Sequence, residues 1–172
     1  MSTTGNTTVP PSGHHLLVEL RNDGIYFASF DPLEDDTYQS CSVSFTAKNR
    51  PLCENVKNCV YENPQLLQEY DRTYILVDTS HFTFVPEELE KEEENRLPYY
   101  DFCFSGHDDH VIENHLVLNH AYLLFGVEHE LYTFLCRTFS NPIILHPLAS
   151  LCEYFFLHSR NGKETKAHLH LR

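Results

Sequence analysis

Short apolar runs separated by polar turns fill the first 78 positions and predict the order β-β-β-α-β. Strands are predicted at residues 15–20, 25–30, 40–46 and 73–77. A helix is predicted from Pro51 to Glu62, because apolar residues recur there at helical spacing and proline suits the first helical position. The run at 73–77 is a continuous β-type run, which indicates a buried strand.

The pattern changes after position 78. It predicts strands at 81–85, 111–118, 121–125, 142–145 and 167–172, and helices at 86–96, 128–139 and 147–160. The helix at 86–96 is expected to begin at Pro86 and to end before Pro98. Aromatic residues at 99–104 recur with a period near two, so this segment is interpreted as a strand. Residues 1–13 are rich in Ser, Thr, Pro and Gly, which predicts a disordered tail.

Composition narrows the class of protein. The 172 residues include 25 Asp+Glu and 12 Lys+Arg, giving a net charge of −13, and 41% are hydrophobic. This acidic balance argues against binding to nucleic acid or to anionic lipid. No apolar run has the length of a membrane span, so direct membrane insertion is not expected. The six cysteines form no Cys-x-x-Cys pair and most lie in apolar runs, which favours buried, reduced thiols and a cytoplasmic location.

Metal-ligand residue types gather between positions 107 and 120. The group comprises His107, Asp108, Asp109, His110, Glu113, His115 and His120. Imidazole and carboxylate groups are ligands of Zn²⁺ and other transition metals. No helix supports the spacing of His107 and His110, and no downstream motif completes the set. A solvated acidic loop that binds no metal is therefore the favoured interpretation, and metal binding through His107 and His110 is the alternative.

A second charged segment occupies residues 87–94, with six glutamates and one lysine in eight positions. The glutamates are Glu87, Glu88, Glu90, Glu92, Glu93 and Glu94. As a helix, this segment would present acidic side chains nearly all round its axis. A solvated surface is the default interpretation, and a contact surface for a basic protein partner is the functional one.

Three segments resemble a known family. They are YILVDTSHFTFVPEEL at 74–89, YLLFGVEHELYTFL at 122–135 and HPLASLCEY at 146–154. With the order of elements, they resemble an uncharacterised bacterial family of unknown function that has an actin-like ATPase fold. Pilus-assembly and secretion scaffold proteins of actin-like fold are more distantly similar.

The resemblance covers most of residues 14–172 and implies an α/β fold with a mixed sheet, of the actin-like ATPase (ribonuclease H-like) kind. Only the first half of that fold is implied. Its first subdomain would comprise residues 14–78 and 140–165, and a small α/β subdomain would be inserted at 79–139. Residues 166–172 would start a second repeat, because the end of the chain echoes residues 18–21.

The resemblance also draws attention to the turn between the first two strands, where actin-like ATPases bind phosphate. Here the turn carries Asn22, Asp23 and Gly24, with one glycine and no Ser or Thr. The acidic side chains of Glu19 and Asp23 would repel a polyphosphate unless Mg²⁺ intervened. A plain hairpin turn accounts for these residues without a ligand, because Asn, Asp and Gly tolerate positive φ.

The first expected function is a non-enzymatic scaffold or protein-interaction module that needs no cofactor and has an unidentified, basic protein partner. No catalytic signature such as Gly-x-Ser-x-Gly and no Walker sequence is present. The alternative is a nucleotide-binding actin-like ATPase that takes ATP and Mg²⁺ and whose cleft is completed by a second domain. Arg172 would then be the end of a truncated chain. The strand at 167–172 would leave an unpaired edge, which favours self-association.

Overall fold

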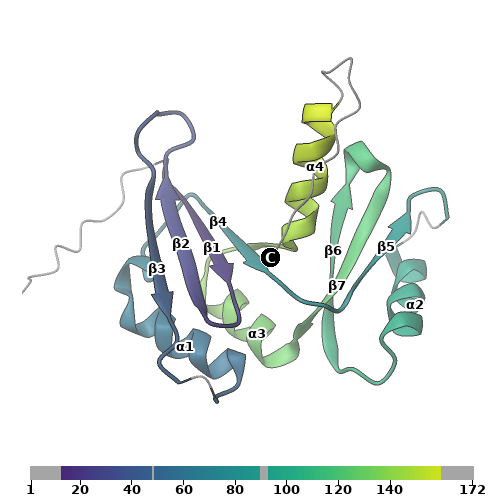
Figure 1. Cartoon of the computed structure of the whole chain (residues 1–172), viewed down its shortest axis with the longest axis horizontal. Helices are drawn as coiled ribbons and strands as arrows, with labels where there is room; N and C mark the ends of the chain where they lie inside the picture. Colours follow the sequence, from purple (N-terminus) through teal and green to yellow (C-terminus); the bar gives the residue numbers. More distant parts are fainter. Residues whose placement is uncertain (1–12, 48, 90–92, 160–172) are drawn as a thin grey trace, which may run out of the picture. The chain divides into compact units, whose positions relative to one another are not determined.

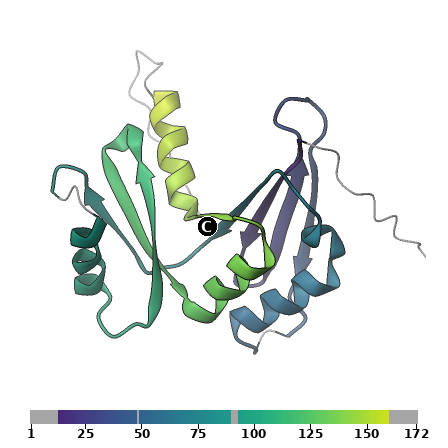
Figure 2. The same ribbon diagram turned by 180° about the vertical axis from the view of Figure 1, so that it is seen from behind.

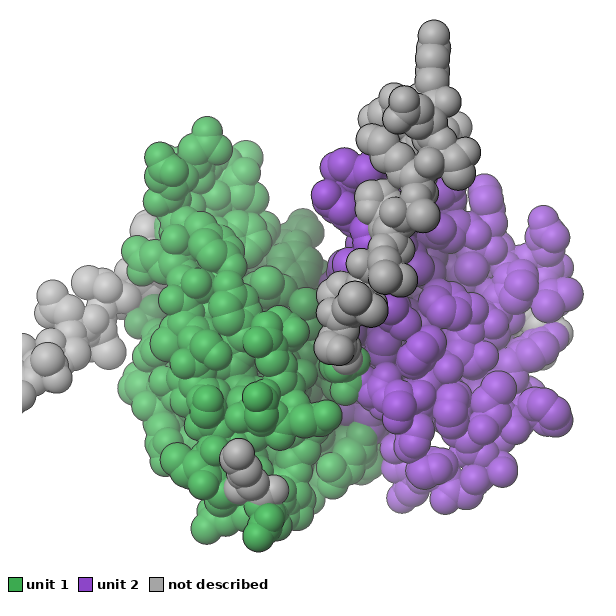
Figure 3. Space-filling model, viewed as in Figure 1, with its two compact units in different colours: residues 1–78, 128–144 green, residues 79–127, 145–172 purple. Residues whose placement is uncertain are grey.

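The computed structural model of the protein describes residues 13–47, 49–89 and 93–159. The chain divides into two compact units (Figure 3). Unit 1 comprises Met1–Asp78 and Glu128–Ile144, and unit 2 comprises Thr79–Val127 and Leu145–Arg172. The chain therefore passes between the units three times, after Asp78, after Val127 and after Ile144.

Unit 1 is built on a five-stranded mixed sheet with the order β3-β2-β1-β4-β8 (Figure 1). Its strands are β1 (His15–Leu20), β2 (Gly24–Phe30), β3 (Gln39–Ser44), β4 (Arg72–Val77) and β8 (Ile143–Leu145). β1 pairs antiparallel with β2 and parallel with β4, and β2 pairs antiparallel with β3. Because a parallel pair needs a crossover, the chain runs from β3 to β4 through α1 (Leu52–Glu62) and the short helix η1 (Pro64–Leu67).

One face of this sheet forms the core of unit 1. Val18 and Ile75 are neighbours in the register of β1 and β4, and both are fully buried. Tyr74 and Leu76 on the opposite face are half-buried, so β4, which the sequence predicts to be a buried strand, is fully buried on one face only. The alternation follows from the two-residue period of a strand that packs on one side.

Two helices of unit 1 pack together. α1 contacts β2 and α3 (His129–Thr138). The rings of Tyr61 in α1 and Phe134 in α3 lie edge to face, with centroids 5.9 Å apart. Lys57 and Glu130 form an ion pair between the same two helices. Figure 2 displays both helices from behind.

Unit 2 contains a three-stranded sheet in the order β5-β7-β6. The strands are β5 (Phe82–Pro86), β6 (Asp109–Leu116) and β7 (Ala121–Glu128), with the short helix η2 (Val117–Asn119) between the last two. Two longer helices, α2 (Glu93–Cys103) and α4 (Pro147–Ser159), cover it. Leu123 and Leu124 point to opposite faces of β7. Leu124 packs with Tyr100 of α2 and Leu123 packs with Ala149 of α4, so each face of the sheet carries one helix.

Three expectations about residues 86–104 are wrong. Pro86 ends β5 and a turn follows at 87–89, so the helix does not begin at Pro86. The first described residue of α2 is Glu93. Pro98 lies inside α2 rather than beyond its end. The aromatic segment is helical up to Cys103 rather than a strand. Tyr100 and Phe102 would share one face of a strand. In the structure they do not, because the ring of Tyr100 packs in the core while Phe102 is 90% exposed.

The compact units also differ from the expected subdomain bounds of 79–139 and 140–165. α3 belongs to unit 1 because it packs on α1, whereas α4 belongs to unit 2 because it packs on β6 and η2. Residues 1–12 and 166–172 lie outside the described residues, and so do the expected tail and the expected last strand.

Candidate functional site

The expected phosphate turn joins β1 to β2 as a tight hairpin. The backbone N–H of Arg21 donates to the carbonyl of Gly24 at 2.9 Å, which leaves Asn22 and Asp23 as the loop. The backbone N–H of Phe45 donates to the carbonyl of Asp23 at 2.8 Å. None of Asn22, Asp23 and Gly24 has a positive φ, so the expected reason for these residue types is wrong.

Gly24 has a packing role instead. A Cβ atom at this position would lie 2.4 Å from the carbonyl oxygen of Val43 and 3.0 Å from the Cα atom of Ser44. Both are backbone atoms of β3, which pairs with β2 at this point. Glycine in a strand often marks the close approach of another backbone. The close approach of β3 therefore explains Gly24 without a ligand.

The charges at this turn do not favour a polyphosphate. The guanidinium of Arg21 donates to the carboxylate of Glu19 at 2.8 Å, and this hydrogen bond raises the pKa of Arg21. The side chain of Asp23 is exposed beside them. One positive and two negative side chains thus surround the turn, and the positive one is already paired.

The glutamate segment does not form the continuous helix that the sequence suggested. Glu87 is half-buried in the turn after β5, where its two carboxylate oxygens lie 3.3 Å from Nδ1 of His120 and 3.9 Å from Nε2 of His115. Glu88 is exposed in the same turn. Glu93 and Glu94 lie at the start of α2. Glu90 and Glu92 lie outside the described residues, so the partner surface stays a prediction.

The structure divides the histidine-rich group. His107 and Asp109 lie together with His81, and one ligand atom from each residue lies within 4.8 Å of the others. His110 follows Asp109 directly in β6, and successive side chains of a strand point to opposite faces. The cluster therefore contains His107 without His110, which the alternative metal-binding interpretation had paired with it. The three residues His81, His107 and Asp109 are called the His-His-Asp cluster below.

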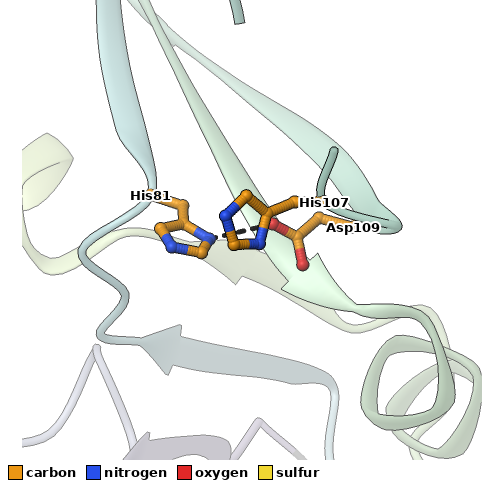
Figure 4. Close-up of side chains that lie close together, drawn as sticks. All are labelled: His81, His107 and Asp109. Carbon is orange, nitrogen blue, oxygen red and sulfur yellow. Dashed lines mark hydrogen bonds and ion pairs between the residues drawn. The ribbon is translucent and has the colours of Figure 1, made fainter. Parts of the chain in front are cut away.

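Three segments of unit 2 supply this cluster (Figure 4). His81 precedes β5, His107 lies in the loop after α2, and Asp109 begins β6. Nδ1 of His81 lies 3.0 Å from Oδ2 of Asp109. The imidazole rings of His81 and His107 are in contact, with centroids 4.2 Å apart.

The hydroxyl of Tyr100 and the backbone of β7 at Gly126 support Asp109 of the cluster. The hydroxyl of Tyr100 donates to Oδ2 of Asp109 at 2.9 Å. Burial raises the pKa of Tyr100, and the hydrogen bond to Asp109 raises it further, so the hydroxyl remains a donor. A Cβ atom at Gly126 of β7 would lie 1.9 Å from this hydroxyl and 2.6 Å from Oδ2 of Asp109. Glycine at 126 therefore allows both groups to rest on the backbone of β7.

The segment that carries His81 is fixed by several hydrogen bonds. Its backbone N–H donates to Oγ1 of Thr79 at 3.1 Å, and its carbonyl accepts from the N–H of Gly126 at 2.9 Å. The buried imidazole of His146 reaches the carbonyl of Thr79 through Nε2 at 3.0 Å. Because Nδ1 of His146 accepts from the N–H of Leu148 at 3.2 Å, its Nε2 carries the proton.

Sequence reasoning missed His81, because it lies far from His107 in the chain. One sequence signal pointed towards a close approach in this part of the chain. Gly126 interrupts an apolar strand, which often marks a close approach. His81 lies at the start of β5, and only the fold brings that point beside the start of β6.

The six cysteines are free thiols. Cys53 and Cys59 are buried and Cys152 is half-buried, and burial raises the pKa of each of these three thiols. Cys41, Cys103 and Cys136 are exposed, so the expectation that most of the cysteines are buried is wrong for half of them. Exposure follows position, since Cys41 lies on β3, an edge strand of the sheet.

The sequence matches the model of one protein family over residues 5–172, and this family is described as a protein of unknown function, DUF3822. The chain belongs to the DUF3822 family. Among solved structures, this DUF3822 chain is similar to a protein of Bacteroides thetaiotaomicron VPI-5482 described as having an actin-like ATPase fold and unknown function. The two are 27% identical and superpose with a TM-score of 0.80, over 94% of this chain and 62% of the other.

These similarities confirm the family of unknown function and the mixed-sheet α/β fold of the actin-like ATPase kind. The DUF3822 chain spans about 62% of the length of the Bacteroides protein. A comparison with curated proteins finds no match. Among residues 13–47, 49–89 and 93–159, no helix is long and apolar enough to cross a membrane.

Proposed function

We propose that this DUF3822 chain is a non-enzymatic scaffold or protein-interaction module on a degenerate actin-like ATPase fold. The proposal rests on the contacts that the residues of the β1–β2 turn make. Gly24 allows the backbone of β3 to approach closely, and Arg21 is paired with Glu19. The carbonyl of Asp23 accepts a hydrogen bond from the backbone N–H of Phe45, the residue after β3. The residues that would meet a phosphate are thus engaged in holding the hairpin.

The partner in this proposal is a basic protein with an apolar contact surface. The net charge of −13 and the glutamates of residues 87–94 supply the electrostatic part. Leu97, Tyr99 and Phe102 of α2 supply the apolar part, because all three side chains are exposed. Aromatic residues are enriched at protein interfaces. A cytoplasmic location belongs to the same proposal and is supported by the six free thiols.

Thermal unfolding with Mg-ATP tests the absence of a nucleotide site. A ligand at 100 times its dissociation constant adds about 2.7 kcal/mol to the stability of the native state. We expect an unchanged melting temperature at saturating Mg-ATP, with Mg-ADP and Mg²⁺ alone as controls. A clear upward shift with the nucleotide complexes but not with Mg²⁺ alone would contradict the proposal.

A second candidate function rests on the length of the Bacteroides protein, of which this chain covers 62%. It is a nucleotide-binding actin-like ATPase whose cleft is completed by a further domain. In a protein extended to the length of that relative, ATP and Mg²⁺ would bind and Asp23→Ala would weaken binding. An extended protein that folds and binds ATP equally well with and without Asp23→Ala would count against a role for this turn.

A further inference from the structure

We propose that His81, His107 and Asp109 bind a divalent transition-metal ion of the Zn²⁺ type. Two imidazole nitrogens and one carboxylate oxygen are a ligand set that suits Zn²⁺ and related ions. One such atom from each residue lies within 4.8 Å of the other two. All three residues belong to unit 2, so the proposal does not depend on the β1–β2 turn or on the scaffold function.

The distances in the cluster are close to those that a metal requires. With metal–ligand bonds of about 2.1 Å, neighbouring ligand atoms around a tetrahedral zinc ion lie about 3.4 Å apart. Nδ1 of His81 and Oδ2 of Asp109 are already 3.0 Å apart. The other separations, at most 4.8 Å, must close by about 1.4 Å or less. His107 is exposed, so rotation of its side chain achieves this without moving the core.

The groups around the ligands resemble the outer shell of a metal site. Carboxylate ligands of metals are themselves hydrogen-bonded, and these contacts orient the ligand. The hydroxyl of Tyr100, a residue only 2% exposed, donates to Oδ2 of Asp109. His81 is held at its N–H by Thr79 and at its carbonyl by Gly126. Two of the three ligands are therefore positioned before a metal arrives, which lowers the conformational cost of binding.

A hydrogen-bonded pair of His81 and Asp109 is the simpler interpretation, but it accounts for only part of the geometry. It gives no reason for the ring of His107 to lie 4.2 Å from that of His81. A shared metal ion gives His107 a role as well, because both imidazoles and the carboxylate would converge on it. Three protein ligands leave the fourth position of a tetrahedral ion to water. Exposed His107 marks the side from which that water enters.

Zinc titration of the full chain tests the proposal. The protein is stripped with a chelator and titrated calorimetrically with Zn²⁺ against a competing chelator. We expect one tight equivalent, which His107→Gln and Asp109→Asn each weaken by at least about 100-fold, because loss of an outer-shell partner alone costs about 10- to 100-fold. Circular dichroism verifies folding, and His107→Gln is the safer variant because the residue is exposed.

A matched control separates this site from the other histidines of the chain, which has 12. His120→Gln removes an exposed imidazole of unit 2 that pairs with Glu87 and does not belong to the cluster. We expect it to bind zinc like the unaltered protein. No stoichiometric zinc binding by the unaltered protein, or equal weakening by His120→Gln and His107→Gln, would overturn the proposal.

Cobalt substitution tests the ligand types, because the six cysteines offer an alternative metal site. A Co²⁺ ion held by nitrogen and oxygen shows ligand-field bands without the thiolate charge-transfer band. We expect that spectrum, and we expect Tyr100→Phe to weaken metal binding by about tenfold through Asp109. A thiolate band that persists in His107→Gln would assign the metal to cysteine and refute the site.

Discussion

The β1–β2 turn of unit 1 and the His-His-Asp cluster of unit 2 contain residue types that bind ions, yet they differ in what holds them. At the turn, Gly24 and Arg21 each have a structural partner within one hairpin and its neighbouring strand. At the cluster, three separate segments bring ligand-type atoms within 4.8 Å of one another. Residues that are adjacent in the chain lie close together in any turn, so their proximity says little about function. The residues of the cluster come from three separate segments, and only the fold of unit 2 brings them together.

The two regions also differ in their glycines. Gly24 faces backbone atoms of β3, and Gly126 faces the side chains of Tyr100 and Asp109. The first glycine serves the pairing of two strands. The second lets polar side chains occupy the space that a Cβ would fill, which is a requirement of a site rather than of a sheet.

Alanine at each glycine gives the largest expected effect. Overpacking costs about 1–3 kcal/mol. We expect Gly24→Ala at the upper end, because the Cβ would lie 2.4 Å from the backbone oxygen of Val43. Gly126→Ala is expected to lose less stability but also to lower zinc affinity, since it displaces Tyr100 and Asp109. Urea denaturation and zinc titration measure the two effects, and a loss of zinc affinity in Gly24→Ala would remove the distinction.

Substitution of one buried polar residue in each unit gives the next effect. His146→Leu leaves the carbonyl of Thr79 and the N–H of Leu148 without their partner, which costs about 1–3 kcal/mol. Asn55→Leu in unit 1 removes the donor to the carbonyls of Ala47 and Arg50. We expect both to lower the denaturation midpoint, and only His146→Leu to weaken zinc binding. Equal zinc affinity in the two variants would show that Thr79 does not position His81.

A smaller effect is expected on partner binding. Phe102→Ser in unit 2 and Leu33→Ser in unit 1 remove side chains that are 90% and 92% exposed. If α2 contacts a basic partner, Phe102→Ser weakens binding by about 1–2 kcal/mol, as interface aromatic residues do. Leu33→Ser is the matched control and is expected to bind normally. Affinity chromatography with each variant, followed by measurement of the captured partner's affinity, decides this, and equal binding by both variants would exclude α2.

The smallest effect is expected at the turn itself. Asp23→Ala removes an exposed side chain, while the backbone carbonyl of residue 23 still accepts from Phe45. We expect the thermal unfolding profile to stay the same with and without Mg-ATP. A shift on ATP addition that disappears in the variant would restore a nucleotide role to unit 1.

Among the described residues, the predicted strands and helices agree with the structure apart from their exact ends, except near residues 86–104, and this exception has a physical reason. Proline suits both the first position of a helix and the end of an edge strand. β5 is at the edge of its sheet, so Pro86 remains in the strand. Tyr100, Phe102 and Phe104 stand two positions apart in the sequence, which is the period of a strand. In the structure, Tyr100 is the one member of this set that is fully buried. The reason is that residues two positions apart point in different directions on a helix, whereas they share a face in a strand.

The candidate site could be predicted only in part. His107 and Asp109 stand close together in the sequence and were identified as metal-ligand types. Their partner His81 depends on the pairing of β5 and β7 and on the placement of β6 beside β7, which no local pattern specifies. Tyr100 was assigned to a strand, so its approach to Asp109 could not be anticipated.

The strand order of unit 1 has a consequence for synthesis of the protein on the ribosome. β4 is complete at Val77, but β8, which covers its outer edge, begins at Ile143. Translation of residues 78–142 takes about 3 to 13 seconds at about 5–20 residues per second. Throughout that interval the nascent chain presents β4 with one row of unpaired backbone groups, a template for misassociation. The most vulnerable moment of unit 1 therefore falls during translation, before unit 2 has been fully made.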